Sequence, residues 1–303
     1  IDESRDVVSD VVGARPNEVV FTGWGTESDN TAIVGAGRRR GGVAVCSAAE
    51  HHAVLHVVES LGGSVVPVGA AGRIDLEALA AVLDDHRAAE RDVAVVSVMA
   101  VNNEVGTVTD LNAVAEVVRR RAPGALLHTD AVQAPSWLDL RTITPLVDLL
   151  ALSAHKFGGP KGVGVLVERG GPQVDPLIIG GGQERERRSG THNVAGIVAA
   201  ATALELTDAE RSSEIARIGD LRDRLVDGLL AQLDGVVETV PRAEKVAGSA
   251  HVCIPGIESE ALLFLLDEAV VCASAASACA SGAMEPSHVL AAMGVDRATS
   301  LGA

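Results

Sequence analysis

Few groups in this chain could act as an amine nucleophile, because lysine occurs only as Lys156, Lys161 and Lys245. Lys156 follows an apolar run and precedes a turn rich in glycine and proline. A lysine at such a place can be desolvated, which lowers the pKa of its amine and makes it a Schiff-base nucleophile. Lys161 lies within the turn itself, and Lys245 lies in a polar stretch that predicts a solvated amine. The sequence therefore favours Lys156.

The thiols form a second set of reactive groups: Cys46, Cys253, Cys272 and Cys279. They are widely spaced, with no CxxC pair, which predicts reduced thiols rather than a disulfide framework. Cys279 lies in a tract of very small residues, 273–282, which predicts a mobile, exposed loop. Cys272 ends an apolar run and is predicted to lie in the core.

Polar residues follow two of the predicted strands. After Thr22, the segment 23–28 turns into a helix, whose free amide groups could cradle a phosphate. Alternatively, Thr26 and Asp29 form an ordinary capping box. Asp130 follows another apolar run, where a carboxylate could pair with a protonated pyridine nitrogen or simply cap the next helix.

His51 and His52 begin a predicted helix. Adjacent residues point to different sides of a helix, so they predict no metal site. One ring could stack on an aromatic cofactor while the other faces water, although a pair of surface histidines fits the same pattern.

Short β-branched runs alternate with helical patterns, which predicts an α/β fold with a mostly parallel sheet covered by helices on both faces. The predicted strands are residues 18–22, 42–46, 64–68, 93–99, 125–129, 149–153 and 164–168. The predicted helices are residues 53–61, 76–83, 111–121, one from about 26 and a long one from 194 to about 233. Ligands bind at the carboxyl ends of such strands, where the polar residues above are predicted to lie.

The length of 303 residues predicts a large domain, residues 1–205, and a smaller C-terminal α+β domain, residues 206–303, with strands at 251–254 and 270–273. The net charge of −16 argues against a nucleic-acid scaffold, and the aromatic content of 2% argues against a base-stacking surface. No apolar run is long enough to span a bilayer, and no signal segment is recognisable, which predicts a cytoplasmic protein.

Taken together, the motifs resemble the cysteine desulfurases, a group of fold-type I pyridoxal-phosphate enzymes of the class V aminotransferase type. The resemblance covers essentially the whole chain, with its motifs in the family's order. They are residues 26–30, 50–51, 101–106, 130–133, 153–156, 180–185, 188–191, 277–279 and 285–290.

The resemblance implies a role for each matching residue. Lys156 would bind pyridoxal phosphate covalently and shuttle the Cα proton of L-cysteine, and Cys279 would take the sulfur as a persulfide, leaving alanine. The remaining implied contacts are Asp130 to the pyridine nitrogen, Gln133 to the ring oxygen, His51 stacked on the ring, Asn103 near ring and substrate, and Gly25, Thr26, Ser153 and His155 on the phosphate. Thr191 would reach the phosphate in the partner subunit's site, which implies a homodimer.

The small residues around Cys279 resemble the branch with the longer catalytic loop, whose members typically pass sulfur to iron–sulfur cluster scaffolds or tRNA-thiolation enzymes. Two departures stand out: the family usually has a further N-terminal segment and an arginine shortly beyond residue 303, and Trp24 occupies a turn that is normally small. Alternatives are a selenocysteine lyase or an aminotransferase of the same fold, or a truncated, non-catalytic protein that docks sulfur-transfer partners. Cys279 favours sulfur chemistry, because transamination needs no thiol.

Overall fold

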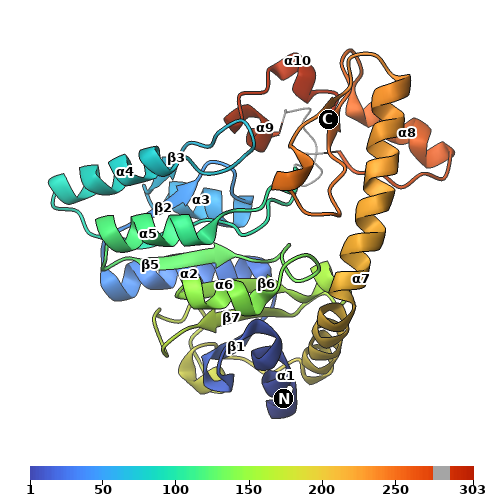
Figure 1. Ribbon diagram of the computed structural model, residues 1–303. Helices are drawn as coiled ribbons and strands as arrows, with labels where there is room; N and C mark the ends of the chain where they lie inside the picture. Colours follow the sequence, from blue (N-terminus) through green and yellow to red (C-terminus); the bar gives the residue numbers. More distant parts are fainter. Residues whose placement is uncertain (276–286) are drawn as a thin grey trace.

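The computed structural model describes residues 1–275 and 287–303. Its centre is a seven-stranded sheet with helices on both faces, and a group of smaller elements lies beyond one end of that sheet (Figure 1). This arrangement confirms the predicted α/β class.

The strand order is β1-β7-β6-β5-β4-β2-β3. The neighbouring strands β3, β2, β4, β5 and β6 run parallel to one another, whereas β7 runs antiparallel to both of its neighbours, β6 and β1. The sheet is therefore mostly parallel, as predicted. The strands are β1 (Val19–Thr22), β2 (Val43–Ser47), β3 (Ser64–Val66), β4 (Val93–Ser97), β5 (Leu126–Asp130), β6 (Leu149–Ser153) and β7 (Gly164–Glu168).

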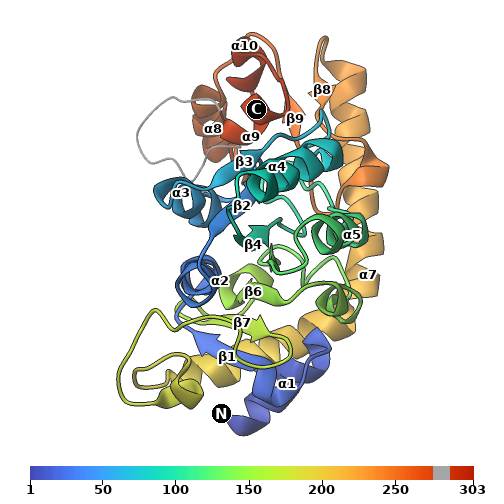
Figure 2. The ribbon, with the colours of Figure 1, turned by 90° about the vertical axis from the view of Figure 1, so that its left-hand side faces the viewer.

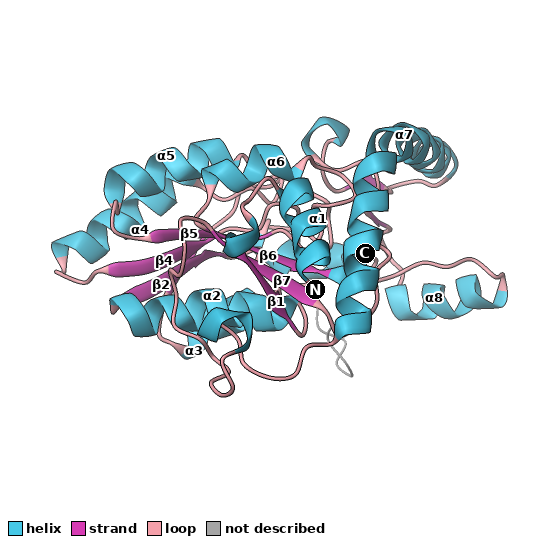
Figure 3. Ribbon diagram, turned by 90° about the horizontal axis from the view of Figure 1, so that it is seen from below, coloured by secondary structure: helices cyan, strands magenta, loops and turns pink. Residues whose placement is uncertain are grey.

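The sheet separates two apolar cores. One face is covered by α2 (Gly25–Arg40) and α3 (His52–Ser60), and the other by α1 (Asp2–Val12), α4 (Leu76–Ala88), α5 (Leu111–Arg121), α6 (Leu140–Ile143) and the start of α7 (Val194–Gln232) (Figure 3). Because both faces are covered, every residue of β4, β5, β6 and β7 is buried. Continuous β-branched runs in the sequence are the expected signature of such strands.

The helices bury their apolar residues against this sheet, as α5 illustrates. In α5 the buried residues include Leu111, Val114, Ala115 and Val118, which lie on one face at helical spacing. The last turn carries Arg119, Arg120 and Arg121, where cations interact favourably with the helix dipole.

Helix α7 is 39 residues long and links the sheet to the smaller elements (Figure 2). Its N-terminal part is buried at Ile197, Ala200, Ala201 and Leu204, and it then continues past the predicted boundary between residues 205 and 206. The division into two domains at that point stays a prediction.

Beyond α7 lie β8 (Val237–Glu238), β9 (Val252–Cys253), α8 (Ser259–Glu268), α9 (His288–Ala292) and α10 (Arg297–Ser300). The predicted strand at 270–273 is wrong. Val270 follows the end of α8 with a φ of 60° and is 90% exposed, and residues 271–273 are irregular. The described residues contain no helix that could span a membrane.

Candidate active site

A hollow of about 250 Å³ opens at the carboxyl ends of β1, β5 and β6. Nine of the ten residues predicted to bind a cofactor line it, and Thr191 is the exception. The lining residues are Trp24, Gly25, Thr26, Asp29, His51, Met99, Asn103, Asp130, Val132, Gln133, Ser153, His155 and Lys156. The topology thus gathers these residues in one place, while their roles toward a cofactor stay predictions.

One end of the hollow is formed by the start of α2. The helix begins at Gly25 with Trp24 as its N-cap residue, and no described side chain caps it. The capping box predicted for Thr26 and Asp29 is therefore wrong, and the first amide groups of α2 stay available to an anion. A Cβ atom on Gly25 would lie 2.9 Å from Val132 Cγ2 and 3.1 Å from Ser153 Cβ, so this backbone approaches its neighbours as only glycine allows.

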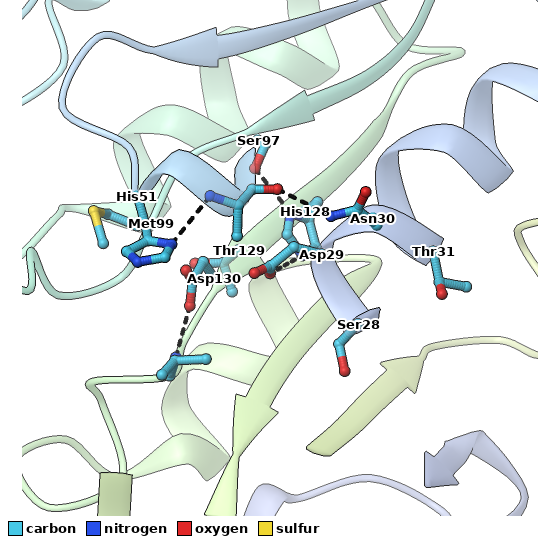
Figure 4. Close-up of polar contacts among 12 residues, drawn as sticks. Ser28, Asp29, Asn30, Thr31, His51, Ser97, Met99, His128, Thr129 and Asp130 are labelled. Carbon is cyan, nitrogen blue, oxygen red and sulfur yellow. Dashed lines mark hydrogen bonds and ion pairs between the residues drawn. The ribbon is translucent and has the colours of Figure 1, made fainter. Parts of the chain in front are cut away.

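Asp130 ends β5, and its side chain is among those that line the hollow. Its Oδ1 atom accepts a hydrogen bond from Val132 N at 2.9 Å (Figure 4). Burial raises the pKa of this carboxyl group to about 6, against the opposing effects of that hydrogen bond and of the Lys156 ammonium. A positive ligand group beside Asp130 would therefore strongly favour its ionised form.

His51 is the N-cap residue of α3, and its Nδ1 atom accepts a hydrogen bond from Ala53 N at 3.1 Å. The ring proton therefore lies on Nε2. Burial lowers the pKa of His51, and the neighbouring His52 and Lys156 lower it further. A neutral, half-buried imidazole thus faces the hollow, which suits stacking on an aromatic ring.

His52 instead stacks on His56 and packs against His288, with ring centroids 4.4 Å apart in both pairs. Among the described residues, no group of histidine, cysteine or acidic side chains is arranged to hold a metal ion.

Lys156 lies in a short 3₁₀ turn, Ala154–Phe157, directly after β6. It lines the hollow but is exposed, so the predicted desolvation of its amine is wrong. The predicted solvated amine of Lys245 is also wrong: its side chain is fully buried, and its Nζ atom lies 2.8 Å from Glu238 Oε1. Lys156 is the only one of the three lysines among the residues that line the described hollow.

Asn103 and Gln133 line both this hollow and a larger cavity of about 610 Å³. Asn103 Oδ1 is buried and has no hydrogen-bond partner within the described chain. The larger cavity is mostly apolar, and Leu225, Leu229 and Leu262 are among its lining residues. It extends the hollow toward α7 and α8, so a small substrate could lie between Asn103 and the C-terminal elements.

The thiols differ from the sequence prediction at one position. Cys272 is exposed and lines the larger cavity, so its predicted place in the core is wrong. Cys46 and Cys253 are buried, and burial raises the pKa of both thiols. Cys279 lies outside the described residues. Cys272 is therefore a reachable thiol that the sequence does not predict, because the apolar run before it indicates a strand.

Thr191 is exposed and does not line the described hollow. The segment before it packs on its own chain: Arg188 Nε lies 2.8 Å from Glu27 Oε1, and Glu27 Oε2 accepts a bond from Gly23 N at 2.8 Å. This ion pair ties Arg188 to the turn that precedes α2. The reach of Thr191 into a partner's site stays a prediction.

The sequence and the fold of this chain match those of known proteins. The family model described as Aminotransferase class-V matches residues 1–300. The IscS-like cysteine desulfurase of Mycobacterium tuberculosis is 42% identical over all of this chain and 79% of its own length, and the cysteine desulfurase IscS of Methanosarcina thermophila is 40% identical over 97% of this chain and 73% of its own length.

Among solved structures, a NifS-like protein aligns with a TM-score of 0.89 and 36% identity, covering 99% of this chain and 80% of that protein. A structure described as SspA in complex with cysteine aligns with a TM-score of 0.81 and 28% identity, over 99% of this chain and 84% of the other. The chain therefore belongs to the class V aminotransferase family and, within it, to the cysteine desulfurases. This confirms the family predicted from the motifs.

Proposed function

We propose that this chain binds pyridoxal phosphate in the hollow beside α2 and removes the sulfur atom from free L-cysteine, giving L-alanine and a persulfide on Cys279. The observation that carries the proposal is the meeting of Lys156, Asp130 and the uncapped start of α2 around one hollow of about 250 Å³. Membership of the cysteine desulfurases supports the reaction, and the related SspA structure contains cysteine.

The residues present fit this cofactor. The start of α2 offers free amide groups to a phosphate, and Gly25 leaves no room there for a side chain. Ser153 Oγ and His155 Nδ1 lie 2.9 Å apart at the same end and add a hydroxyl group and a ring nitrogen. Asp130 offers a carboxyl group whose ionisation a cation would favour, and Asn103 Oδ1 lacks a partner among the described residues.

Pyridoxal phosphate, when bound, supplies an electron sink for the bonds at the Cα atom of an amino acid. Lys156 Nζ would hold the cofactor covalently and then take and return the Cα proton. Asp130 would keep a proton on the pyridine nitrogen, Gln133 would contact the ring oxygen, and His51 would cover one ring face with a neutral imidazole.

The sulfur step needs a thiolate that attacks the substrate sulfur. The Cys279 thiolate forms the new S–S bond while the C–S bond of cysteine breaks, and the electron pair of that bond stays with the carbon. That carbon is then protonated, which completes alanine and leaves the persulfide on Cys279. Cys46 and Cys253 are poor nucleophiles, because burial holds both as neutral thiols.

We further propose a homodimer in the cytoplasm in which Thr191 contacts the phosphate of the partner's site. An iron–sulfur scaffold or a tRNA-thiolation protein would receive the sulfur. An active, cofactor-loaded monomer in light scattering would contradict the composite site.

The function is tested by locating the cofactor. Borohydride reduction of the loaded protein followed by peptide mapping should place the pyridoxyl group on Lys156. In a separate assay, the unreduced loaded protein should release alanine from cysteine, and sulfide when a thiol reductant such as dithiothreitol reduces the persulfide. Lys156→Ala should lose both the label and the visible absorption band. Lys161→Arg is the matched control and should keep both, because Lys161 lies outside the lining of the described hollow. A label on Lys161 or Lys245 would overturn the assignment.

A further inference from the structure

A largely buried ion pair joins the turn before α2 to a segment that lies 161 positions further along the chain. Arg188 donates to the Glu27 carboxylate through Nε at 2.8 Å and through Nη2 at 3.2 Å, and Glu27 Oε2 also accepts a bond from Gly23 N at 2.8 Å. Only 7% of the Glu27 side chain and 22% of the Arg188 side chain are exposed. Two bonds between a guanidinium and a carboxylate fix direction as well as distance, so this pair holds its two segments firmly together.

Thr191 lies at an exposed tip, three positions beyond Arg188. Both flanks of this tip are held on the body of the chain. Arg188 is fixed by Glu27 on one side, and His192 Nε2 lies 2.7 Å from Glu184 Oε1 on the other. A tip that is fixed on both flanks loses little conformational entropy when a ligand or a partner contacts it. Such a tip suits a residue that acts outside its own chain.

Glu27 connects the Thr191 tip to the proposed phosphate cradle of its own subunit. It lies in the first turn of α2, whose free amide groups would hold the phosphate there. Thr191 is exposed and lies outside the lining of its own hollow, so it would contact the phosphate of the partner's site. In a two-fold dimer the same contact occurs twice, once toward each site. The position of the tip in one subunit therefore bears on the phosphate that the other subunit binds.

We propose that Glu27 and Arg188 are positioning residues that hold the Thr191 tip of one subunit in place for the phosphate group bound in its partner. The inference rests on the proposed homodimer with composite sites, and it adds that the phosphate affinity of one site depends on Arg188 of the other subunit. Neither Glu27 nor Arg188 needs to touch the ligand. A purely structural ion pair would stabilise its own subunit and leave the phosphate affinity of the partner's site unchanged.

Mixed dimers, purified through different affinity tags on the two subunits, separate these roles. One subunit carries Lys156→Ala together with Arg188→Ala, and the other is unchanged, so the visible absorption band reports only the unchanged subunit's site. Pyridoxal phosphate should bind that site about tenfold more weakly than in a mixed dimer whose first subunit carries Lys156→Ala alone, because the displaced Thr191 loses one hydrogen bond to a charged group. Pyridoxal, which lacks the phosphate, should bind both mixed dimers equally. Equal affinities for pyridoxal phosphate would overturn the proposal.

Arg39→Ala is the matched control for Arg188→Ala. Arg39 lies at the other end of α2 and pairs with Asp175 at 3.4 Å, and both side chains are exposed. In the same mixed dimer, Arg39→Ala should leave the affinity for pyridoxal phosphate unchanged. A tenfold loss in this control as well would mean that any arginine of the subunit has the same effect, which contradicts a specific role of Arg188.

A second variant covers a failure of Arg188→Ala to fold, since that change leaves the Glu27 carboxylate buried without its counter-charge. The double substitution Glu27→Gln, Arg188→Gln removes both charges, and glutamine is shorter than arginine, so the contact is lost without an unpaired buried charge. On the Lys156→Ala subunit, this double variant should produce the same tenfold loss in the partner's site. An unchanged affinity would again overturn the proposal.

Failure of the proposed function would appear in the parent protein. A parent that is monomeric in light scattering, or that binds no pyridoxal phosphate, contradicts the composite site before any variant is compared, and the inference falls with it. A dimeric parent that binds pyridoxal phosphate, together with mixed dimers of equal affinity, overturns only the positioning role of Glu27 and Arg188.

Discussion

Glu184 offers the sharpest test of what holds the segment before Thr191 in place. Its carboxylate is 1% exposed and accepts bonds from both terminal nitrogens of Arg5 at 2.7 Å. It also accepts a bond from Phe21 N at 2.8 Å and lies 2.7 Å from His192 Nε2. These contacts hold Glu184 at a φ of 50°, a backbone conformation that costs a residue with a side chain about 1–3 kcal/mol.

We expect Glu184→Gln to destabilise the fold by about 3–5 kcal/mol, the range for breaking a buried ion pair by changing one partner. The substitution keeps the size of the side chain but leaves Arg5 buried without its counter-charge. It also turns one of the two acceptor oxygens into an NH₂ group that faces a donor. Arg5 keeps one bond to the remaining amide oxygen, its hydrogen bond to Val19 O and its position over the Phe21 ring, and none of these replaces the lost charge.

The pH dependence gives the sign of the effect. Burial raises the pKa of Glu184, but the hydrogen bonds from Arg5 and Phe21 N outweigh burial and leave this pKa below its usual value. The stabilisation is therefore complete above the unfolded pKa of about 4.3 and is lost as the pH falls through the lower folded pKa. Urea unfolding at pH 7 should show the full difference between parent and Glu184→Gln, and the difference should shrink below about pH 4.

Glu186→Gln is the control, because Glu186 is exposed and two residues away in the same turn. It should change the free energy of unfolding by less than about 0.5 kcal/mol. A loss for Glu184→Gln that is no larger than this, or one that does not change with pH, would refute the ion-pair reasoning.

Two further predictions concern the site. Gly25→Ala should destabilise the protein by about 1–3 kcal/mol and weaken cofactor binding, because its Cβ atom would meet Val132 and Ser153. Gly37→Ala is the control in the same helix: nothing lies within 4 Å of its Cβ position, so it should stabilise the protein by about 0.5–1 kcal/mol. Equal cofactor affinities of the two variants would contradict the close fit at Gly25. Cys279→Ala should keep the visible absorption band yet release no sulfur. Cys272→Ala replaces an exposed thiol, so it should keep turnover and change the free energy of unfolding by less than about 0.5 kcal/mol. If instead Cys272→Ala lost turnover and Cys279→Ala kept it, Cys272 would be the sulfur acceptor.

The sequence predicted the sheet and the residues at its carboxyl edge, because both depend on local patterns. β6 and β7 have the bounds that their apolar runs predicted, since strands covered on both faces are mostly apolar. Asp130 and Ser153 end neighbouring strands, so a parallel sheet necessarily brings them close together. Their convergence with Lys156 follows from topology once the strands are known.

Burial of single side chains could not be predicted in the same way, because it depends on partners far along the chain. Lys245 lies in a polar stretch but is buried beside Glu238. Cys272 follows an apolar helix, and no strand among residues 1–275 and 287–303 pairs with it. The Arg5–Glu184 pair joins residues 179 positions apart, and no local pattern in the sequence indicates it.

The charge of the proposed site depends on the same distant partners. Asp29, Glu50 and Asp130 come from three separate segments and meet beside a single nearby lysine, Lys156. If all three carboxyl groups were ionised, the site would carry a net negative charge and would repel a phosphate. Burial raises the pKa of Asp29 and of Glu50 well above their usual values, which favours the neutral forms of both groups and reduces the negative charge near Lys156. The free amide groups of α2 can then attract a phosphate, while the Asp130 carboxylate can attract a cation.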